Sequence, residues 1–546
     1  MSQVVGLDMV TGMGFIGLEP GRLYKIGQSP KLKDQTASGN PLLLNSAEAP
    51  LTSLTLYGWS KQDGTPSPDN PVPIVSAGSV MVESKNLWRN PKPSTMEGVT
   101  LTYEGNYIVL NGTCTASANF QLLQNTLFAG EYTLSAEVQG DCPDNFASLV
   151  QIYSSSTGFN MQIPNNNRNP VTNTLAETIN DAYFRVRIDV GFQYNNVKIR
   201  VMLNAGQTAL PYEPYFTPYA DPDEGEINVT VQGGNLFDSS QLDDENNFDK
   251  SFSGSGYWII KFPVPSEDIT VSVGKISNVN DCYFAVSSSY GVEDVYRQWF
   301  VHSTATNGKT SVTYSKNEHG EYIYLYFRNM MAAVQKALNE CDYIQIEVGD
   351  TATQYMPYKT PQTLTAQTPG GLPGIPVSSG GNYTDESGQQ WICDEVDFSR
   401  GKYVKRVNMK TFDGSKDEFW STYVTPGYEG FAINILDMLV TESGPGLSNL
   451  FPIGGVAGQP RIRLGANNNR MYMNNTNPDI ATTVDEWLSW LSNNPLRVLY
   501  VLETPIETDL SDEEMAAYKA LHTYSPATTV SNDAGAWMKV GYKANA

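Results

Sequence analysis

Apolar and polar residues alternate with a period of two along most of the chain, the pattern of strands that bury one face. Turn sequences such as Asn111-Gly112 and Asn307-Gly308 separate these segments and supply the positive φ that hairpin turns need. The alternating segments include 107–110, 132–138, 183–190, 258–262 and 322–327. We therefore predict a mainly β protein built from several jelly-roll-like β-sandwich domains.

Two stretches of the chain begin and end alike. An alternating segment leads into Asn-Leu-Trp at 86–88 and, later, into Asn-Leu-Phe at 235–237. Each stretch closes with an alternating strand, a glycine turn and a Tyr-x-Pro-Tyr sequence. Because each has the size of one sandwich domain, we predict two equivalent β-sandwiches. In each, the Asn-Leu-aromatic segment should lie beside the closing strand. The predicted domains are 80–219 and 220–360.

Residues 46–79 and 361–407 flank these two stretches, and each flank is too short to bury a core alone. We predict that they pack together as one small discontinuous β platform into which both sandwiches are inserted. Joining residue 78 to residue 368 should then leave a folded protein. The apolar side chains available for the core of the platform are Leu54, Leu56, Trp59, Ile74, Ile375, Trp391, Ile392, Val396 and Phe398.

The ends of the chain differ from its middle. Residues 408–510 predict a C-terminal β-sandwich, with a short helix at 484–491. Residues 511–546 predict a helix and a strand, because Ser511 and Glu514 have the spacing of a capping box. Short helices are thus expected near the C-terminus. We interpret residues 1–45 as an N-terminal segment that attaches the chain to a neighbouring protein.

Charge narrows the possible partners. The 546 residues include 35 Lys and Arg against 58 Asp and Glu, a formal net charge of −23. This argues against nucleic acid or an anionic membrane as a partner. No segment has the length and apolarity of a membrane-spanning helix. The N-terminus lacks a basic region, so we expect synthesis in the cytoplasm without a signal peptide.

Cysteine and acidic residues suggest no metal centre. The five cysteines show no C-x-x-C spacing, and we predict buried free thiols. The sequence Asp394-Glu395-Val396-Asp397 predicts a solvated hairpin edge, because at most two of its three acids share one face of a strand. A structural calcium ion held by Asp394 and Asp397 is the alternative. No other cofactor is expected.

Catalytic motifs are missing from the sequence. It contains no G-x-S-x-G, no H-E-x-x-H and no phosphate-binding Walker loop, and it has only three histidines. Thr384–Trp391 is similar to the Asp-box turn of sialidases, but its spacing differs and it occurs once. We predict a β-hairpin with an inward Trp391. The chain is therefore interpreted as a non-enzyme, with a polysaccharide depolymerase as an alternative.

Three segments carry a family resemblance. Residues 54–78 (LTLYGWSKQDGTPSPDNPVPIVSAG), 371–407 (beginning GLPGIPVSSGGNYTDESGQQW) and 500–542 (ending NDAGAWMKVGY) closely resemble segments of tail and tail-fibre proteins of phages and prophages of gut Firmicutes. The two repeated units look like the carbohydrate-binding-type jelly rolls that such proteins carry. The resemblance implies a virion component at the tail or a surface appendage: a tail fibre, tail tip or baseplate protein. It also implies a homo-oligomer, most simply a trimer. Residues 1–45, which lie outside the resemblance, are the segment through which we expect contact with other virion proteins.

Host surface polysaccharide is the ligand that this resemblance implies. Aromatic rings in the repeats near Ser- and Asn-rich loops are candidates to stack on sugars, although packing in the core is the alternative for each ring. A dedicated glycan binder should expose aromatics, whereas a non-adhesive spacer or head-fibre protein should hide them. The candidates for glycan binding are Phe120, Tyr153, Phe159, Trp258, Tyr290, Tyr296 and Trp299.

Overall fold

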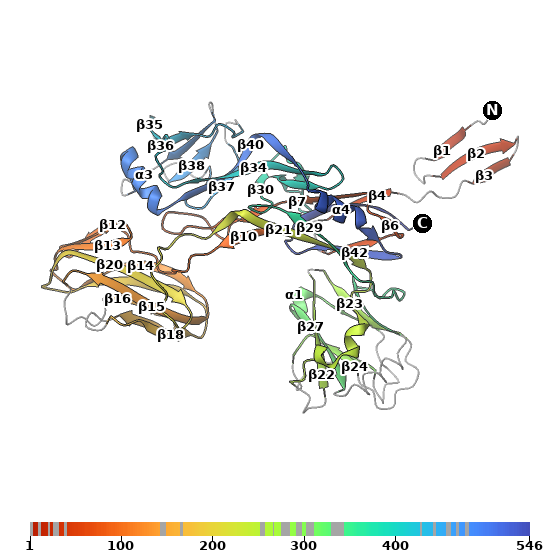
Figure 1. Cartoon of the computed structure of the whole chain (residues 1–546), viewed down its shortest axis with the longest axis horizontal. Coiled ribbons are helices and arrows are strands. Elements are labelled where there is room, and N and C mark those ends of the chain that lie inside the picture. The colour runs from red at the N-terminus through yellow and green to blue at the C-terminus, as the bar shows by residue number, and fades with distance from the viewer. Residues whose placement is uncertain are drawn as a thin grey trace. The chain divides into compact units, whose positions relative to one another are not determined.

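The computed structural model divides the chain into two compact units, Met81–Tyr219 and the combination of Met1–Val80 with Ala220–Ala546 (Figure 1). Within some of its strands it describes the backbone only. It describes all residues except 1–3, 9–12, 20–21, 26–31, 38–40, 142–148, 164–167, 252–256, 266, 275–283, 291–297, 302–310, 329–342, 426–427, 440–443, 455–459, 466–468, 475–479 and 546.

The unit Met81–Tyr219 is a sandwich of two antiparallel sheets. Trp88 and Phe184 stack at 5.0 Å in the core between them. The six-stranded sheet has the order β11 (Ser94–Met96), β12 (Val99–Glu104), β13 (Tyr107–Thr113), β20 (Gln193–Ala205), β15 (Gly130–Gln139) and β18 (Val171–Leu175). The four-stranded sheet has the order β14 (Ala118–Leu127), β19 (Ile179–Ile188), β16 (Val150–Ser154) and β17 (Asn160–Ile163).

A second sandwich in the other unit repeats this strand order. Its three-stranded sheet, β26-β23-β28, matches β18-β15-β20, and its four-stranded sheet, β22-β27-β24-β25, matches β14-β19-β16-β17. Before β22 lie two 3-10 helices, η1 (Ser239–Asp243) and η2 (Glu245–Asn247), and the four-residue helix α1 (Lys316–His319) follows β26. The strands are β22 (Tyr257–Pro263), β23 (Ile269–Val273), β24 (Phe284–Ser287), β25 (Gln298–Val301), β26 (Ser311–Tyr314), β27 (Tyr322–Arg328) and β28 (Ile344–Val348).

Matching hydrogen bonds confirm that the two sandwiches are equivalent. Leu87 N donates to Leu203 O at 2.7 Å, and Leu236 N donates to Ile346 O at the same distance. The Asn-Leu-aromatic segment therefore lies beside the closing strand in both, as predicted. The predicted start of the second sandwich is wrong, however, because β21 (Tyr219–Gly233) belongs to a sheet of the platform instead.

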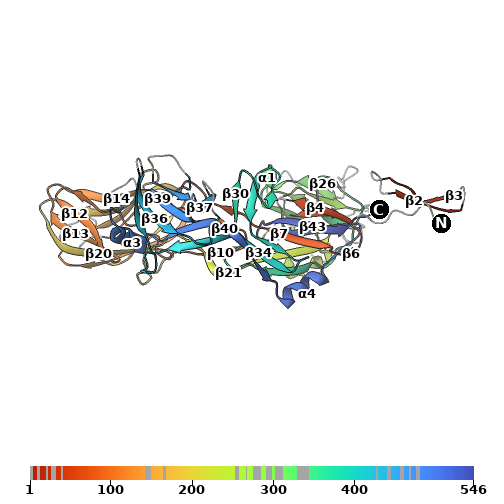
Figure 2. The same cartoon turned by 90° about the horizontal axis from the view of Figure 1, so that it is seen from above.

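The two predicted flanks do form one discontinuous β platform. Strand β33 (Glu395–Asp397) pairs with β7 (Ser53–Tyr57), with Val396 opposite Leu56. Figure 2 shows β7, β43 (Trp537–Lys543) and β4 (Leu32–Ala37) as neighbours in the same seven-stranded sheet. The remaining strands of that sheet are β37 (Gly446–Ser448), β40 (Leu496–Asp509) and β34 (Lys402–Phe412).

The platform is larger than predicted, because both ends of the chain and the linker between the sandwiches complete it. Its five-stranded sheet has the order β10 (Ser79–Val82), β21, β42 (Ala527–Asn532) and β5 (Leu42–Asn45), with β29 (Gln362–Gln367) also paired to β21. The predicted boundaries at residues 45 and 511 are therefore wrong. Small sheets join β6 (Ala49–Pro50) to β41 (His522–Thr523), β8 (Ser60–Lys61) to β9 (Val75–Ser76), and β32 (Gln390–Cys393) to both β30 (Gly374–Val377) and β31 (Tyr383–Thr384).

These strand pairings change the expectation for the chain that joins residue 78 to residue 368. Val229 and Val231 of β21 and Leu364 of β29 are fully or almost fully buried in the same core as Leu54 and Leu56. Joining residue 78 to residue 368 removes these strands along with the sandwiches, so the shortened chain loses a wall of its own core.

Residues 408–510 have a core of their own, and β34 and β40 connect it to the seven-stranded sheet. A four-stranded sheet, β35 (Ser421–Thr425), β36 (Tyr428–Asn434), β39 (Arg470–Asn474) and β38 (Arg461–Leu464), packs with helix α3 (Val484–Asn493) around the fully buried Trp487. Both predicted C-terminal helices are present, and Ser511 and Glu514 form the expected capping box of α4 (Asp512–Ala520). Near the N-terminus, β1 (Val4–Asp8), β2 (Met13–Glu19) and β3 (Arg22–Lys25) form a separate small sheet.

Candidate functional site

A pocket lies at one edge of the first sandwich. Strands β17 and β18 are the edge strands of its two sheets, and both contribute residues to a cavity of about 480 Å³. Phe159 and Leu175 form an apolar floor and are nearly buried, at 7% and 4% exposure. The exposed rim is polar and consists of Thr157, Asn160, Thr174 and Glu177, with Asn173 half-buried between them.

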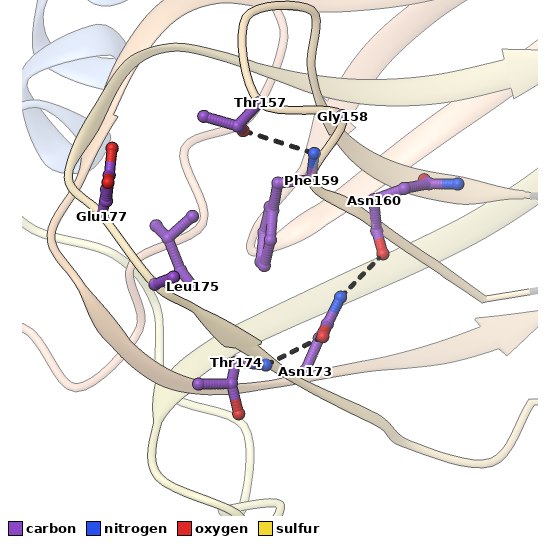
Figure 3. A pocket seen from close by; sticks show the side chains of 9 residues that line it. Thr157, Gly158, Phe159, Asn160, Asn173, Thr174, Leu175 and Glu177 are labelled. Atoms are coloured by element: carbon purple, nitrogen blue, oxygen red, sulfur yellow. Dashed lines mark hydrogen bonds between the residues drawn. The ribbon is translucent and has the colours of Figure 1, made fainter.

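One side-chain hydrogen bond joins the two edge strands beneath this rim. Asn173 Nδ2 on β18 donates to the carbonyl oxygen of Asn160 on β17 at 3.1 Å, and Asn173 Oδ1 accepts from Thr174 N at 2.8 Å. Figure 3 shows the Phe159 ring between this pair and Leu175. The amide therefore holds the edges of two different sheets at a fixed separation.

The loop between β16 and β17 is organised by one carboxylate. Asp181 Oδ1 accepts from the hydroxyls of Ser154 at 2.6 Å and Ser156 at 2.9 Å, while Oδ2 accepts from Ser156 N and from the Ser155 hydroxyl. These hydrogen bonds, the one from Ser154 first, hold the pKa of Asp181 well below its usual range. Because the loop continues into Thr157 and Phe159, the carboxylate fixes one wall of the pocket.

The chemistry of this pocket suits a small polar ligand with an apolar face. An apolar floor with a few converging amide, hydroxyl and carboxylate groups is the usual composition of small-molecule sites. A sugar ring presents C–H groups on its face and hydroxyls around its edge, which matches the Phe159 floor and the polar rim. The pocket is thus a candidate saccharide subsite.

Three of the predicted aromatic candidates are core residues. Phe120 is 2% exposed, Phe159 is 7% exposed and Trp258 is 8% exposed, and each belongs to the buried cluster of its own sandwich. The prediction that these rings are presented to a ligand is wrong for Phe120 and Trp258, because the alternation of their strands directs them inward. Phe159 reaches the surface only as the floor of the pocket.

Of the other four candidates, two are at least partly exposed and two have side chains outside the described residues. Tyr153 is half-buried on the outer face of the four-stranded sheet, and Tyr290 is 47% exposed. The Tyr290 hydroxyl donates to Asp249 Oδ2, so part of its polar edge is already used. Tyr296 lies outside the described residues, as does the side chain of Trp299, whose backbone belongs to β25.

The residues that build the pocket form no recognisable motif in the sequence. Asn160, Asn173 and Asp181 act through contacts between segments that the sequence separates. The available signal was the run of three serines at 154–156, because closely spaced hydroxyls next to a strand end are natural donors to a carboxylate.

The acidic cluster at 394–397 is part of the platform core, not a solvated edge. Asp394 is fully buried and Glu395 is 7% exposed. Asp394 Oδ1 accepts from the main-chain N–H groups of Arg406 at 2.6 Å and Val407 at 2.9 Å, at the irregularity in the pairing of β34 with β40. Burial raises the pKa of Asp394 to about 7, although these bonds oppose the shift.

The two calcium candidates serve separate networks. Asp394 also accepts from the Tyr403 hydroxyl, whereas Asp397 accepts from the Ser399 hydroxyl and from Arg400 N. Over the described part of the chain, no group of three or more His, Cys, Asp or Glu side chains is arranged to hold a metal ion. Cys114 and Cys393 are buried free thiols, as predicted, and the other three cysteines lie outside the described residues.

The Asp-box-like segment is a hairpin, as predicted. Strand β31 pairs with β32, and Asp385 Oδ1 accepts from the main-chain N–H groups of Ser387 and Gln389, both at 3.0 Å. The Trp391 indole donates to Asp385 Oδ2, and its ring packs edge-on against Trp537 at 4.9 Å. These contacts explain the segment as a structural turn of the platform.

Comparison with known proteins assigns the chain to no family. No protein-family model matches the chain, and no curated protein matches it significantly. In the portion that the structure describes, no helix has the length and apolarity to span a membrane.

Proposed function

We propose that the protein is a component of a phage virion, a tail fibre or a tail-tip or baseplate protein, and that it binds glycans on the host surface through its first sandwich. The resemblance of three platform segments to phage tail proteins supports the virion assignment. The two tandem sandwiches support an adhesive role, because sandwich domains present rigid sites at their edges and loops.

One observation carries the glycan proposal: the pocket between the edge strands β17 and β18. Its apolar floor, polar rim and loop held by Asp181 form a preorganised saccharide-sized site. Preorganised loops lower the entropic cost of binding. Single sites of this size bind weakly, and the homo-oligomer, most simply a trimer, raises the apparent affinity through multivalency.

A blocking variant tests the proposal. The full chain is applied to a glycan array, and the best ligand is then titrated by calorimetry. Asn173→Trp, on the same face of β18 as the floor residue Leu175, fills the mouth of the pocket and should abolish binding, whereas Thr102→Trp, at an exposed position on β12, should leave it intact. Binding that survives in Asn173→Trp contradicts the pocket as the site, and an array without any bound glycan contradicts the adhesive role.

The burial of the aromatic candidates favours a second function, a non-adhesive spacer or head-fibre protein. Phe120 and Trp258 stabilise cores, which is what a spacer needs. A spacer should bind no glycan, yet should still assemble into a defined homo-oligomer in light scattering. Release of reducing ends from capsule or wall polysaccharide would instead indicate a depolymerase.

A further inference from the structure

The first sandwich carries two arginines that are each placed against two tyrosine rings, one on each sheet. On the six-stranded sheet the Arg200 guanidinium lies 4.6 Å from the ring centre of Tyr107 and 4.7 Å from that of Tyr212. On the four-stranded sheet the Arg185 guanidinium lies 5.0 Å from the Tyr153 ring and 4.9 Å from the Tyr183 ring. Stacking of this kind fixes the orientation of the planar guanidinium group.

The two arginines differ in their counter-ion. Directly across the strands, Arg200 faces Glu137, which forms an ion pair with it. The residues directly across from Arg185 are Gln121 and Gln151, which are uncharged. Arg185 makes one long hydrogen bond, Nη1 to Gln151 Oε1 at 3.4 Å, and within the described residues it has no carboxylate partner.

Arg185 is on the solvent side of its sheet. Ala182, Phe184 and Val186 of β19 point into the core, so the alternate residues Tyr183 and Arg185 point outward, as does Tyr153 of β16. The carboxylate of Asp181, also on the outer side of β19, binds the serine loop and forms no ion pair with Arg185. On a chain with a net charge of −23, Arg185 is therefore a guanidinium on this face that no described carboxylate pairs with.

The equivalent face of the second sandwich is closed. Ile259, Ala285 and Tyr326 lie on it in a small cluster apart from the main core, and each is 0% exposed. The Tyr326 hydroxyl donates to the carbonyl oxygen of Ser289, in the loop after β24. Among the residues that the structure describes, this sheet of the second sandwich therefore offers no open Tyr-Arg-Tyr platform.

We infer that the outer face of β16 and β19 binds a saccharide that contains a hexuronic acid, with Arg185 pairing to the sugar carboxylate and Tyr153 and Tyr183 contacting the ring. A guanidinium fork matches a carboxylate in geometry and charge. The tyrosines require a pyranose face, which a linear glycerol-phosphate polymer lacks. Tyr153 lies directly across from Asn160 of the pocket rim, so this face continues the pocket between β17 and β18 as one site. The inference rests on the proposed glycan-binding function and names its class of ligand.

Direct titration of the full chain tests the inference. The probes are an oligogalacturonate, the neutral galactose oligomer of equal length and a glycerol-phosphate polymer. We expect the oligogalacturonate to bind most tightly, and Arg185→Gln to weaken it at least about tenfold, as the loss of a charge-assisted pair does. Arg200→Gln is the matched control from the other sheet and should leave binding unchanged.

A second variant supplies the missing counter-ion instead of removing the arginine. Gln151→Glu places a carboxylate directly across from Arg185, as Glu137 is placed across from Arg200, so it should abolish oligogalacturonate binding without lowering the melting temperature. Gln151→Glu therefore tests the inference even if Arg185→Gln fails to fold.

The outcomes separate this inference from the function on which it rests. Equal binding of the charged and neutral oligomers, or oligogalacturonate binding that Gln151→Glu leaves intact, overturns the acidic ligand but not glycan binding. Preference for the glycerol-phosphate polymer overturns the hexuronic acid. Failure to bind any saccharide overturns both.

Discussion

The side-chain oxygens of Asn86 and Asn235 accept the same two main-chain hydrogen bonds in the two sandwiches. Each bonds to the N–H two residues on, at 2.9 Å for Asn86 and 3.0 Å for Asn235. Each also bonds to the closing strand, at Leu203 N (3.0 Å) and Ile346 N (3.2 Å). Both asparagines are nearly fully buried, so one amide ties the start of each sandwich to its end.

Removing either amide should destabilise its own sandwich only. Asn86→Ala and Asn235→Ala each leave two buried N–H groups without an acceptor. Each such group lowers the free energy of unfolding by up to about 3 kcal/mol. We expect faster hydrogen exchange at Leu203 in the first variant and at Ile346 in the second. Each variant is the control for the other, and faster exchange in both sandwiches from one substitution would contradict independent closure.

Local sequence patterns predicted the two repeats because the Asn-Leu-aromatic segment contacts a strand of its own domain. Strand β21 has the same alternating pattern as the strands of the sandwiches. Its pairing with β42 and β29, which the pattern does not reveal, assigns it to the platform. Burial of Asp394 was likewise invisible, because its N–H donors come from a strand irregularity about a dozen residues away. Long-range pairing decided both outcomes.

Phe159 shows the same limit for the candidate site. Its sequence environment, a Ser- and Asn-rich loop, pointed to the region that contains the pocket, but its ring is the floor of a pocket whose rim comes partly from β18. The sequence pattern locates the loop, but the position of the edge strand β18 determines that the loop forms part of a pocket.

The carboxylate of Asp181 should control both the order of the serine loop and binding at the pocket. Asp181→Asn removes half of the acceptor capacity that Ser154, Ser155 and Ser156 share. We expect faster hydrogen exchange across residues 155–159 and weaker binding of any ligand found on the array. Asp141→Asn, at an exposed position, is the control.

The same carboxylate predicts the pH dependence of the loop. The pKa of Asp181 is lowered in the folded chain, so its contribution is fully present above the pKa of the unfolded chain and is lost as pH falls through the folded value. Hydrogen exchange of the loop, corrected for intrinsic rates, should therefore be constant near neutral pH and should rise only in strong acid. A change in loop protection between pH 6 and pH 8 would contradict this role.

Asp394 should have the opposite effect on stability. Its folded pKa of about 7 lies above the ordinary value of 3.8, so the folded chain binds the proton more tightly. The free energy of unfolding should fall as pH rises from about 4 to about 7. Asp394→Asn keeps the Oδ1 acceptor and should remove this slope, whereas Asp397→Asn should retain it. Denaturant titrations of the three proteins at several pH values measure the difference.

The second sandwich should be removable if the platform strands on both sides of it are kept. Strands β21 and β29 pair with Val231 opposite Gln362, so Gly233 and Thr360 end the two arms of a hairpin. Replacing residues 234–359 by Asn-Gly closes it with a favoured turn. We expect β7 of the platform to keep its protection from hydrogen exchange in this chain. It should lose that protection in the chain that joins residue 78 to 368, which removes Val229, Val231 and Leu364 from the platform core. Protection of β7 in the latter would show that these strands do not support the platform.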